Sequence, residues 1–244
     1  SKLPKFRGPS PIPYTILLGE KSAWITVFIL EERMDTGDIV WQKEIPLSGN
    51  ETTIILKQKL FNIISMELPG IITQYISNYL KSRKQDHSQA TYTKLFTRED
   101  GFIPSNIISC ALRGENPKEE ELKKWPLSSM LDTKYLIRNT PAVIERALRA
   151  FSPWPGVWTQ VAIKHLGGDR MGSFRMNLQD ESPEVKGSIK RLKILKAHLE
   201  TFRDRHLKTI RDRQKLVVDL VQLEGKKPVA FRQFMQGYPQ FSFS

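Results

Sequence analysis

Asp35, in the segment Met34-Asp35-Thr36-Gly37-Asp38, is the carboxylate whose surroundings most suggest chemistry in this sequence. A carboxylate held in a fixed place can take part in proton transfer. The same residue types also build turns, because Asp accepts local hydrogen bonds and Gly adopts backbone conformations that other residues avoid. Taken alone the segment therefore favours a turn, with Asp38 closing it. Catalysis by Asp35 needs support from elsewhere in the chain.

A second group of residues carries positive charge close to the C-terminus. Basic side chains interleave with Leu192, Ile194 and Leu195 in an approximate strand alternation, so one face of the strand would be packed and the other positive. We predict that this face binds the phosphate backbone of a nucleic acid, which gives affinity and salt dependence rather than base readout. A solvated strand face is the alternative. The residues predicted to bind are Lys190, Arg191, Lys193, Lys196, Arg203 and Arg205.

The distribution of charge supports the nucleic-acid interpretation. The chain of 244 residues has a formal net charge of +12. Residues 138–244 hold 20 Lys and Arg against 10 Asp and Glu, whereas residues 85–137 hold 7 against 8. A polyanionic partner is the usual reason for such an asymmetry.

Other reactive residue types give no site. The four histidines, His87, His165, His198 and His206, are not spaced with cysteines or acids as metal ligands are, so no metal site is expected. Cys110 is the single cysteine, which excludes an intrachain disulfide and fits a reducing cytoplasm. No run of eighteen apolar residues occurs, so no membrane span or membrane partner is expected. A monomer is expected.

The residues before position 84 predict the end of an α/β sheet. A short helix over residues 12–18 should stop at Gly19. β-branched and aromatic residues predict strands over 24–30 and 39–45, with the Asp35 turn between them. Apolar residues then recur at helical spacing from about Thr52 to Leu80, and Pro69 is expected to kink or divide that helix.

The rest of the chain predicts a linker and a small β-barrel. Residues 85–125 are polar and mixed, which indicates an ordered linker with little helix or strand. Thr140 and Pro141 are typical of a helix start, so a helix is expected over 140–151. An OB-like barrel is predicted from a set of short strands and one closing helix, over residues 157–163, 188–199, 216–223 and 229–236. Residues 202–213 fit either a short helix or an exposed loop.

At this point the motifs resemble a known family. Residues 3–12, Leu-Pro-Lys-Phe-Arg-Gly-Pro-Ser-Pro-Ile, resemble the segment that follows the catalytic histidine of folate-dependent formyltransferases, and residues 34–38 resemble their Leu-Asp-Thr-Gly-Asp motif. Residues 149–156 and 221–231 are similar to the helix-to-barrel junction and the last strand and closing helix of methionyl-tRNA formyltransferases. The matches occur in the family's order, and residues 85–125 and 202–213 are unmatched.

The resemblance implies formyl transfer from 10-formyltetrahydrofolate to the amino group of methionyl-initiator-tRNA. In the family an Asn stabilises the developing oxyanion, and a His oriented by an Asp assists proton movement. On this correspondence Asp35 is the catalytic Asp, and Ser1, Lys2, Leu3 and Pro4 line the folate site. Lys2 departs from the family's usual leucine. Arg7 is expected to order its loop.

The same correspondence gives an expected organisation. Residues 1–84 are predicted to be the C-terminal part of a Rossmann-like formyltransferase domain, 85–137 a linker, and 138–244 an OB-like tRNA-binding domain. The family's Asn and His would precede Ser1, so we expect an N-terminally truncated fragment that is inactive as given. Two alternatives stay open: a sugar N-formyltransferase, and a non-catalytic RNA-binding module. The positive balance of residues 138–244 favours tRNA over a nucleotide-sugar.

Overall fold

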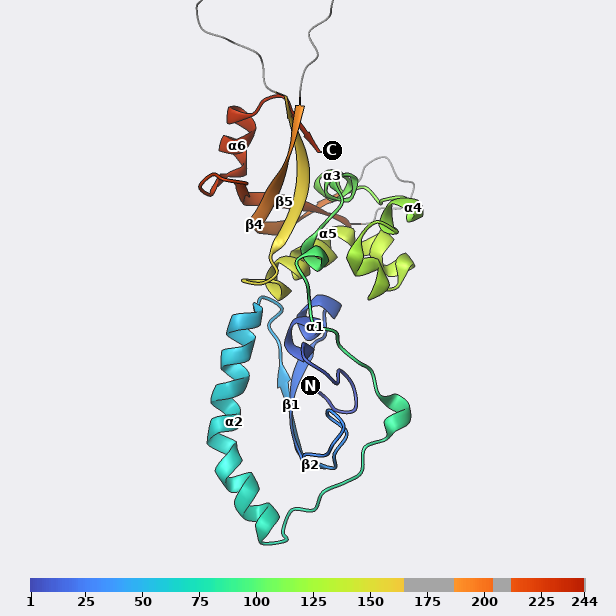
Figure 1. The fold of residues 1–244 in the computed structure, drawn as a ribbon, viewed down its shortest axis with the longest axis vertical. Coiled ribbons are helices and arrows are strands. Elements are labelled where there is room, and N and C mark those ends of the chain that lie inside the picture. The colour runs from blue at the N-terminus through green and yellow to red at the C-terminus, as the bar shows by residue number, and fades with distance from the viewer. Residues whose placement is uncertain (165–186, 204–211, 244) are drawn as a thin grey trace, which may run out of the picture.

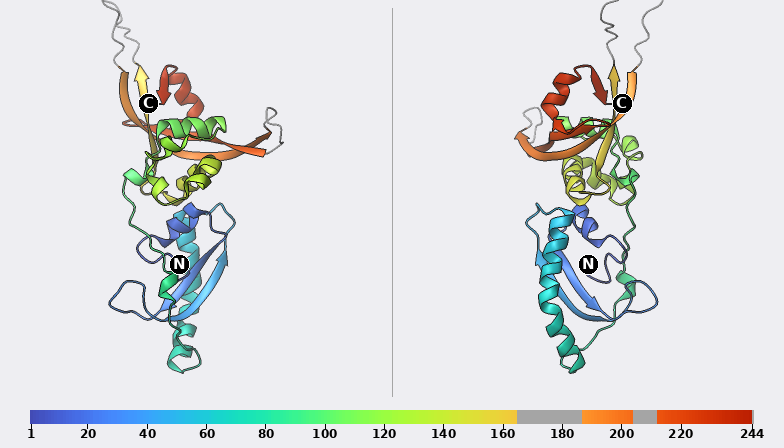
Figure 2. Two further views of the ribbon diagram at one scale, coloured as in Figure 1. Left: turned by 90° about the vertical axis from the view of Figure 1, so that its right-hand side faces the viewer. Right: turned by 60° about the vertical axis from the view of Figure 1, so that its left-hand side comes forward.

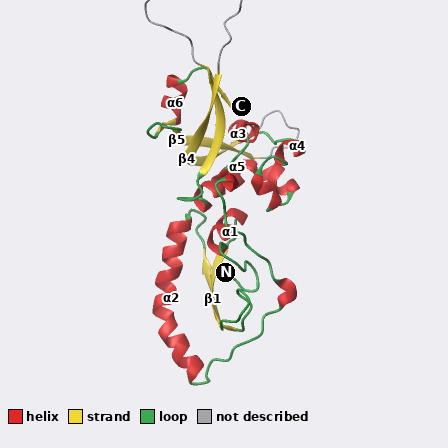
Figure 3. Ribbon diagram, viewed as in Figure 1, coloured by secondary structure: helices red, strands yellow, loops and turns green. Residues whose placement is uncertain are grey.

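The computed structural model describes residues 1–164, 187–203 and 212–243. The strands form two separate groups, one in the upper and one in the lower part, with helices between the groups and beside each of them (Figure 3). The chain starts in the lower part of Figure 1, runs down α2, and returns on the opposite side to reach the upper part. Figure 2 shows the same division from two other sides.

The lower part contains the predicted elements. Helix α1 (Pro11–Leu18) begins with Pro at its first turn and ends at Gly19, whose φ of 72° is the left-handed conformation that closes a helix. Strands β1 (Ser22–Phe28) and β2 (Ile39–Pro46) pair antiparallel. These three predictions are confirmed.

Helix α2 (Thr53–Ile76) is capped by Thr52, whose hydroxyl accepts a hydrogen bond from the Ile55 amide. It buries Leu56, Leu60 and Ile71. The helix continues through Pro69, so of the two predicted outcomes, a kink or a division, the division is wrong. The hydroxyl of Thr73 donates to the Pro69 carbonyl at 2.9 Å.

The segment predicted to be a plain linker has more helix than expected. It contains α3 (Ser105–Arg113), α4 (Glu119–Leu122) and three short 3-10 helices over His87–Gln89, Glu99–Gly101 and Pro126–Ser129. Ile107, Ile108 and Ala111 follow helical spacing and are buried. This apolar set is short and stands among polar neighbours, so the composition of the whole segment hid it.

Helix α5 (Thr133–Ala150) starts earlier than predicted. Its cap is Asp132, whose carboxylate accepts from the Tyr135 amide. Thr140 is not an N-cap: its hydroxyl donates to the Leu136 carbonyl inside the helix. Asn139, with φ −125° and ψ 20°, interrupts the helical geometry directly before Thr140 and Pro141. The Thr-Pro signal therefore marks a kink, because a proline inside a helix removes one backbone donor.

The upper part is a five-stranded sheet in the order β6-β5-β4-β3-β7, with every neighbouring pair antiparallel. The strands are β3 (Val157–Lys164), β4 (Gly187–Arg203), β5 (Asp212–Leu223), β6 (Val229–Ala230) and β7 (Phe241–Phe243), with α6 (Phe231–Gly237) between the last two. The predicted closing helix thus begins as a short strand. Among the described strands β6 and β7 remain as edges, so a closed OB-like barrel is not confirmed.

One hydrophobic cluster joins the two parts. The rings of Tyr14 on α1 and Phe96 lie 5.2 Å apart, and those of Phe96 and Phe151 lie 4.8 Å apart. Polar contacts accompany this aromatic bridge: the Thr53 hydroxyl donates to the Ala150 carbonyl at 2.6 Å. The lower part is therefore packed directly against α5 and the sheet behind it.

Candidate functional site

Asp35 lies in the loop of residues 29–38 that connects β1 to β2. The Ile29 amide donates to the Asp38 carbonyl at 2.9 Å and closes the neck of the loop. A Cβ on Gly37 would lie 1.7 Å from the Ile29 carbonyl oxygen, so only glycine fits there. Asp35 itself has a φ of 58°. This left-handed conformation is unfavourable for a residue with a Cβ, so its surroundings must hold it.

The Asp35 carboxylate is tied to the N-terminal segment. Its Oδ2 accepts a hydrogen bond from the Gly8 amide at 2.6 Å. Gly8 has a φ of 107°, and a Cβ there would lie 2.7 Å from the Thr93 carbonyl oxygen. Glycine at position 8 therefore lets the backbone approach Thr93 closely while its N–H reaches Asp35.

Arg7 and Gln85 support the same loop from inside. Gln85 Nε2 donates to the carbonyls of Asp35 at 3.0 Å and of Gly37 at 2.6 Å. Gln85 Oε1 accepts from Arg7 Nη2 at 2.7 Å, and this nitrogen also contacts His87 Nδ1 at 2.9 Å. Arg7 is 2% exposed and Gln85 6%. The expectation that Arg7 orders its loop agrees with these contacts.

Residues Ser1 to Pro4 lie along β1 on the same side as Asp35. The Ser1 amino group donates to the Trp24 carbonyl at 2.9 Å, and the Lys2 ammonium lies 4.2 Å from the centre of the Trp24 ring. Asp35 lies close enough to Ser1 for its charge to act on the Ser1 nitrogen. The structure thus brings Asp35 and the predicted folate-lining residues into one neighbourhood.

The fit of a folate to these four residues is partial. Each backbone carbonyl is already used: that of Ser1 by Thr26 Oγ1, that of Lys2 by the Lys5 amide, that of Leu3 by Gln42 Nε2, and that of Pro4 by the Thr91 amide. The Leu3 side chain is buried, and the Lys2 side chain is exposed. They form an ordered wall on which Lys2 is the polar side chain open to a ligand, and their role in binding folate stays a prediction.

An open pocket of about 530 Å³ lies beside Asp35. Met34 and Thr36, the two chain neighbours of Asp35, line it, together with Arg7, Glu31, Arg33, His87 and Tyr92. The pocket combines two guanidinium groups with an exposed aromatic ring. It can accommodate an anionic or aromatic part of a substrate next to the carboxylate.

The predicted basic strand is β4, and its alternation is confirmed over residues 192–194 but is wrong at Leu195, which is exposed. Leu192 and Ile194 are 1% and 3% exposed on the core side, whereas Lys193 points to the other face and is exposed. The pairing register shifts between Ile194 and Ala197, which leaves both Leu195 and Lys196 exposed. Such a bulge turns two successive side chains outward.

The other predicted contact residues are placed less uniformly. The Arg191 guanidinium stacks over the Trp158 ring at 4.4 Å. Lys190 pairs with the buried Val161, at a register position on the core side. Arg203 is the last residue of β4, and Arg205 lies outside the described residues. The structure therefore brings Arg191, Lys193 and Lys196 onto the outer face.

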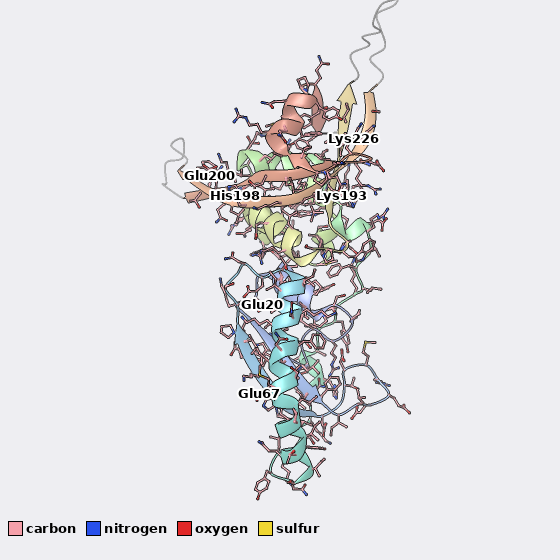
Figure 4. The ribbon with its side chains drawn as sticks, turned by 90° about the vertical axis from the view of Figure 1, so that its left-hand side faces the viewer. Glu20, Glu67, Lys193, His198, Glu200 and Lys226 are labelled. Atoms are coloured by element: carbon pink, nitrogen blue, oxygen red, sulfur yellow. The ribbon has the colours of Figure 1, made fainter. Side chains whose placement is uncertain are left out.

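Positive charge on the outer face is concentrated at one end. A pocket of about 200 Å³ is lined by Arg191, Lys193, Gln222 and Glu224, among others. Toward the other end, His198 Nδ1 lies 3.0 Å from Asp219 Oδ2, and Lys215 Nζ lies 3.0 Å from Glu200 Oε2. Figure 4 shows Lys193 apart from His198 and Glu200 along the strand.

Reactive groups elsewhere add no further centre. Burial raises the pKa of the Cys110 thiol, which disfavours a thiolate. In the part of the chain that the structure describes, no three His, Cys, Asp or Glu side chains converge as metal ligands. His165 and His206 fall outside that part. Across the described ranges no helix is both long and apolar enough to cross a bilayer.

Sequence reasoning missed Gln85 and the amide of Gly8. Gln85 is separated from Arg7 by 78 residues and from Asp35 by 50. No local periodicity reports such a contact. The available signal was a glutamine in a segment whose neighbours match no helix or strand pattern, and that signal is weak.

Comparison with known proteins gives consistent matches. A sequence profile described as formyl transferase matches residues 1–69, and one described as formyl transferase, C-terminal domain, matches residues 138–239. A methionyl-tRNA formyltransferase from Roseiflexus is 34% identical over 160 residues, which are 65% of this chain and 39% of that protein. Another from Treponema denticola is 27% identical over 241 residues, which are 99% of this chain and 62% of that protein. The chain thus spans less than two thirds of the length of these relatives.

Among solved structures, an N-formyltransferase from Helicobacter canadensis in complex with folinic acid and dTDP-3-aminofucose has a TM-score of 0.46 and 16% identity. The match covers 88% of this chain and 62% of that one. At this TM-score the likeness carries no argument about the substrate.

Proposed function

The chain belongs to the formyl transferase family, and from this premise we propose that the complete protein transfers a formyl group from 10-formyltetrahydrofolate to the amino group of methionyl-initiator-tRNA, in translation initiation in the cytoplasm. The observation that carries the proposal is the hydrogen bond from the Gly8 amide to Asp35 Oδ2 at 2.6 Å. It joins the two motifs of the family resemblance, residues 3–12 and 34–38, in a single site.

In this reaction the carboxylate has to assist one proton transfer. The amine nitrogen must bond to the formyl carbon while the carbon–nitrogen bond to the folate breaks; the amine loses one proton and the released folate nitrogen gains one. When bound, 10-formyltetrahydrofolate supplies the formyl carbon. Gly8 fixes one Asp35 oxygen, and no described residue donates to the other, Oδ1. That oxygen is free to hold the proton or to orient an imidazole that accepts it.

The pocket beside Asp35 supports an acceptor with a charged or aromatic end. Arg7 and Arg33 bring positive charge, and Tyr92, 69% exposed, offers a ring face. A terminal nucleotide carries both a phosphate and a base. These features fit a nucleotide-bearing acceptor such as an aminoacyl-tRNA end beside the carboxylate, and the charge of residues 138–244 favours tRNA over a nucleotide-sugar.

The outer face of β4 would hold the body of the tRNA. Lys193 and Lys196 carry solvated charge, and the stacked Arg191 adds a guanidinium of fixed position. Such a face neutralises phosphates without reading bases. The long, bulged β4 and its antiparallel partners are consistent with an OB-like module, a fold that binds oligonucleotides.

The direct test is formylation by the complete protein. Purified protein is incubated with 10-formyltetrahydrofolate and methionyl-tRNA, and formylmethionine is quantified after deacylation. Asp35→Asn should lower kcat/KM by about 10²- to 10⁴-fold, the usual contribution of a general acid–base residue. Asp38→Asn, in the same loop, is the matched control and should stay within about threefold.

Two results would overturn the proposal. One is a wild-type protein that formylates an amino-sugar nucleotide and not methionyl-tRNA. The other is a protein that binds tRNA tightly and formylates neither acceptor, as a non-catalytic RNA-binding module would.

A further inference from the structure

We infer that Arg7 and Gln85 are positioning residues for the reaction: together they fix the backbone of the Asp35 loop and thereby the direction of the Asp35 carboxylate. The inference rests on the proposed function. It assigns a task to two buried side chains outside the motif that contains Asp35.

The Gln85 amide fits its surroundings in one orientation. Its nitrogen donates to the carbonyls of Asp35 and Gly37, at 3.0 and 2.6 Å, and its oxygen accepts from Arg7 Nη2 at 2.7 Å. A side chain at this position must therefore donate on one side and accept on the other. An amide does both, a carboxylate would face two carbonyl oxygens, and a thioether would bond to neither.

The two carbonyls that accept from Gln85 belong to Asp35 and Gly37, and Asp35 is the residue whose backbone conformation is unfavourable. Asp35 occupies a left-handed conformation. Such conformations persist where the surrounding structure imposes them. Gln85 holds the Asp35 carbonyl from one side while Gly8 holds its carboxylate from the other. The residue is thus restrained at its backbone and at its side chain.

Gln85 itself is anchored on both sides along the chain. Arg83 exchanges two backbone hydrogen bonds with Ile39, at 2.8 and 2.9 Å, at the start of β2. Downstream, the Arg7 amide donates to the Thr91 carbonyl at 2.9 Å and the Thr93 amide donates to the Arg7 carbonyl at 2.7 Å. The segment returning from α2 is therefore fastened to β2 and to the Arg7 loop, and Gln85 lies between the two fastenings.

Arg7 completes the arrangement because it connects Gln85 to the N-terminal loop segment that carries Gly8. Its guanidinium is buried, and its Nε has no hydrogen-bond partner among the residues that the structure describes. A buried cation with an unsatisfied nitrogen is costly. Its retention beside the Asp35 loop agrees with a functional task.

A double-mutant cycle on the complete protein tests the inference. Gln85→Met, close in size, removes the hydrogen bonds. It should lower kcat for formyl transfer by about 10- to 100-fold with KM for methionyl-tRNA within about twofold, because small displacements of a reacting group are costly. In an Asp35→Asn background the same change should cost less than about threefold, since the group it positions is gone. Gln74→Met, at an exposed position on α2, is the control.

A purely structural role would give a different pattern. Equal losses from Gln85→Met in the wild-type and Asp35→Asn backgrounds, a raised KM with unchanged kcat, or unchanged kinetics would each overturn the inference. If Gln85→Met does not fold, Arg7→Lys replaces it in the same cycle, with the same expected coupling.

Amide hydrogen exchange gives a readout that does not depend on activity. The amides of Ile29 and Ile39, which donate to the Asp38 and Arg83 carbonyls at the neck of the loop, should exchange at least about tenfold faster in Gln85→Met than in Gln74→Met, because the loop loses the Gln85 donors that hold its carbonyls. Unchanged exchange would overturn the inference. If wild type and Asp35→Asn are equally inactive on methionyl-tRNA, the proposed function fails, and the exchange rates still report whether the loop is held by Gln85.

Discussion

The Asp35 loop and the outer face of β4 both carry charge, and they are held in different ways. Around Asp35, buried polar groups define direction: Gln85 and the Gly8 amide bond to the loop on opposite sides. On β4, Leu192 and Ile194 anchor the strand in the core, and Lys193 stands exposed beside them. Proton transfer depends on where an oxygen points, whereas attraction to a polyanion depends on the amount of charge nearby. The two regions match these two requirements.

The largest expected effect comes from Gly37→Ala. The new Cβ would lie 1.7 Å from the Ile29 carbonyl oxygen, so the neck of the loop must open. We expect a loss of about 3 kcal/mol in the free energy of unfolding, measured by urea denaturation. Gly70→Ala is the control: its Cβ meets nothing within 4 Å in α2, so it should be neutral or stabilising by about 0.5 kcal/mol. If the two variants were equally stable, the Asp35 loop would not depend on the close approach of Gly37 to Ile29.

Charge-conserving substitutions sharpen the contrast next. Asp35→Glu keeps the charge and moves the oxygens, so kcat should fall about 100-fold in the formylation assay. Lys193→Arg also keeps the charge, and tRNA affinity should stay within about twofold. If Asp35→Glu retained full activity, direction would not be the property that the loop supplies.

Glu51 tests whether local hydrogen bonds also fix a buried carboxylate at the junction of the two parts. Burial favours its neutral acid, but hydrogen bonds from Ser48 and Gly49 outweigh burial and lower the pKa of Glu51 from 4.5 to about 2. Its stabilising contribution is therefore present above about pH 4.5 and is lost as the pH falls toward 2.

Glu51→Gln should lower the free energy of unfolding by about 1.5 kcal/mol at pH 7, because hydrogen bonds to a charged acceptor are lost. The difference from wild type should shrink below pH 4.5 in denaturant titrations. The exposed Glu20→Gln is the control and should change stability by less than about 0.5 kcal/mol. A difference that is constant with pH would contradict the assignment.

The smallest effect is expected on β4. Lys193→Ala should weaken tRNA binding about three- to tenfold and reduce the slope of log affinity against log salt by about one, because one phosphate contact is lost. Lys215→Ala removes a lysine already paired with Glu200 and should change neither quantity. Equal effects of the two substitutions, in filter binding over a salt series, would mean that position on the sheet does not matter.

Local signals in the sequence predicted much of this fold. Helix 12–18 with its glycine stop, the strands on both sides of Asp35, and the alternation around Leu192 depend on near neighbours. The start of α5 was wrong because Thr140 and Pro141 mark a kink inside a helix as well as a beginning. Gln85 was missed because its partners lie 78 and 50 residues away. The hydrogen bonds that orient Asp35 join residues far apart in the sequence, so no periodic pattern of residue types predicts them.

The aromatic bridge of Tyr14, Phe96 and Phe151 has a consequence for substrate choice. Because these rings belong to one continuous core, the spacing between the Asp35 carboxylate and the Lys193 ammonium cannot change without exposing buried apolar surface. The distance between these two groups is therefore set by the core. Under the proposed function, an acceptor that contacts both groups at once must be long enough to span this distance, as a tRNA would be.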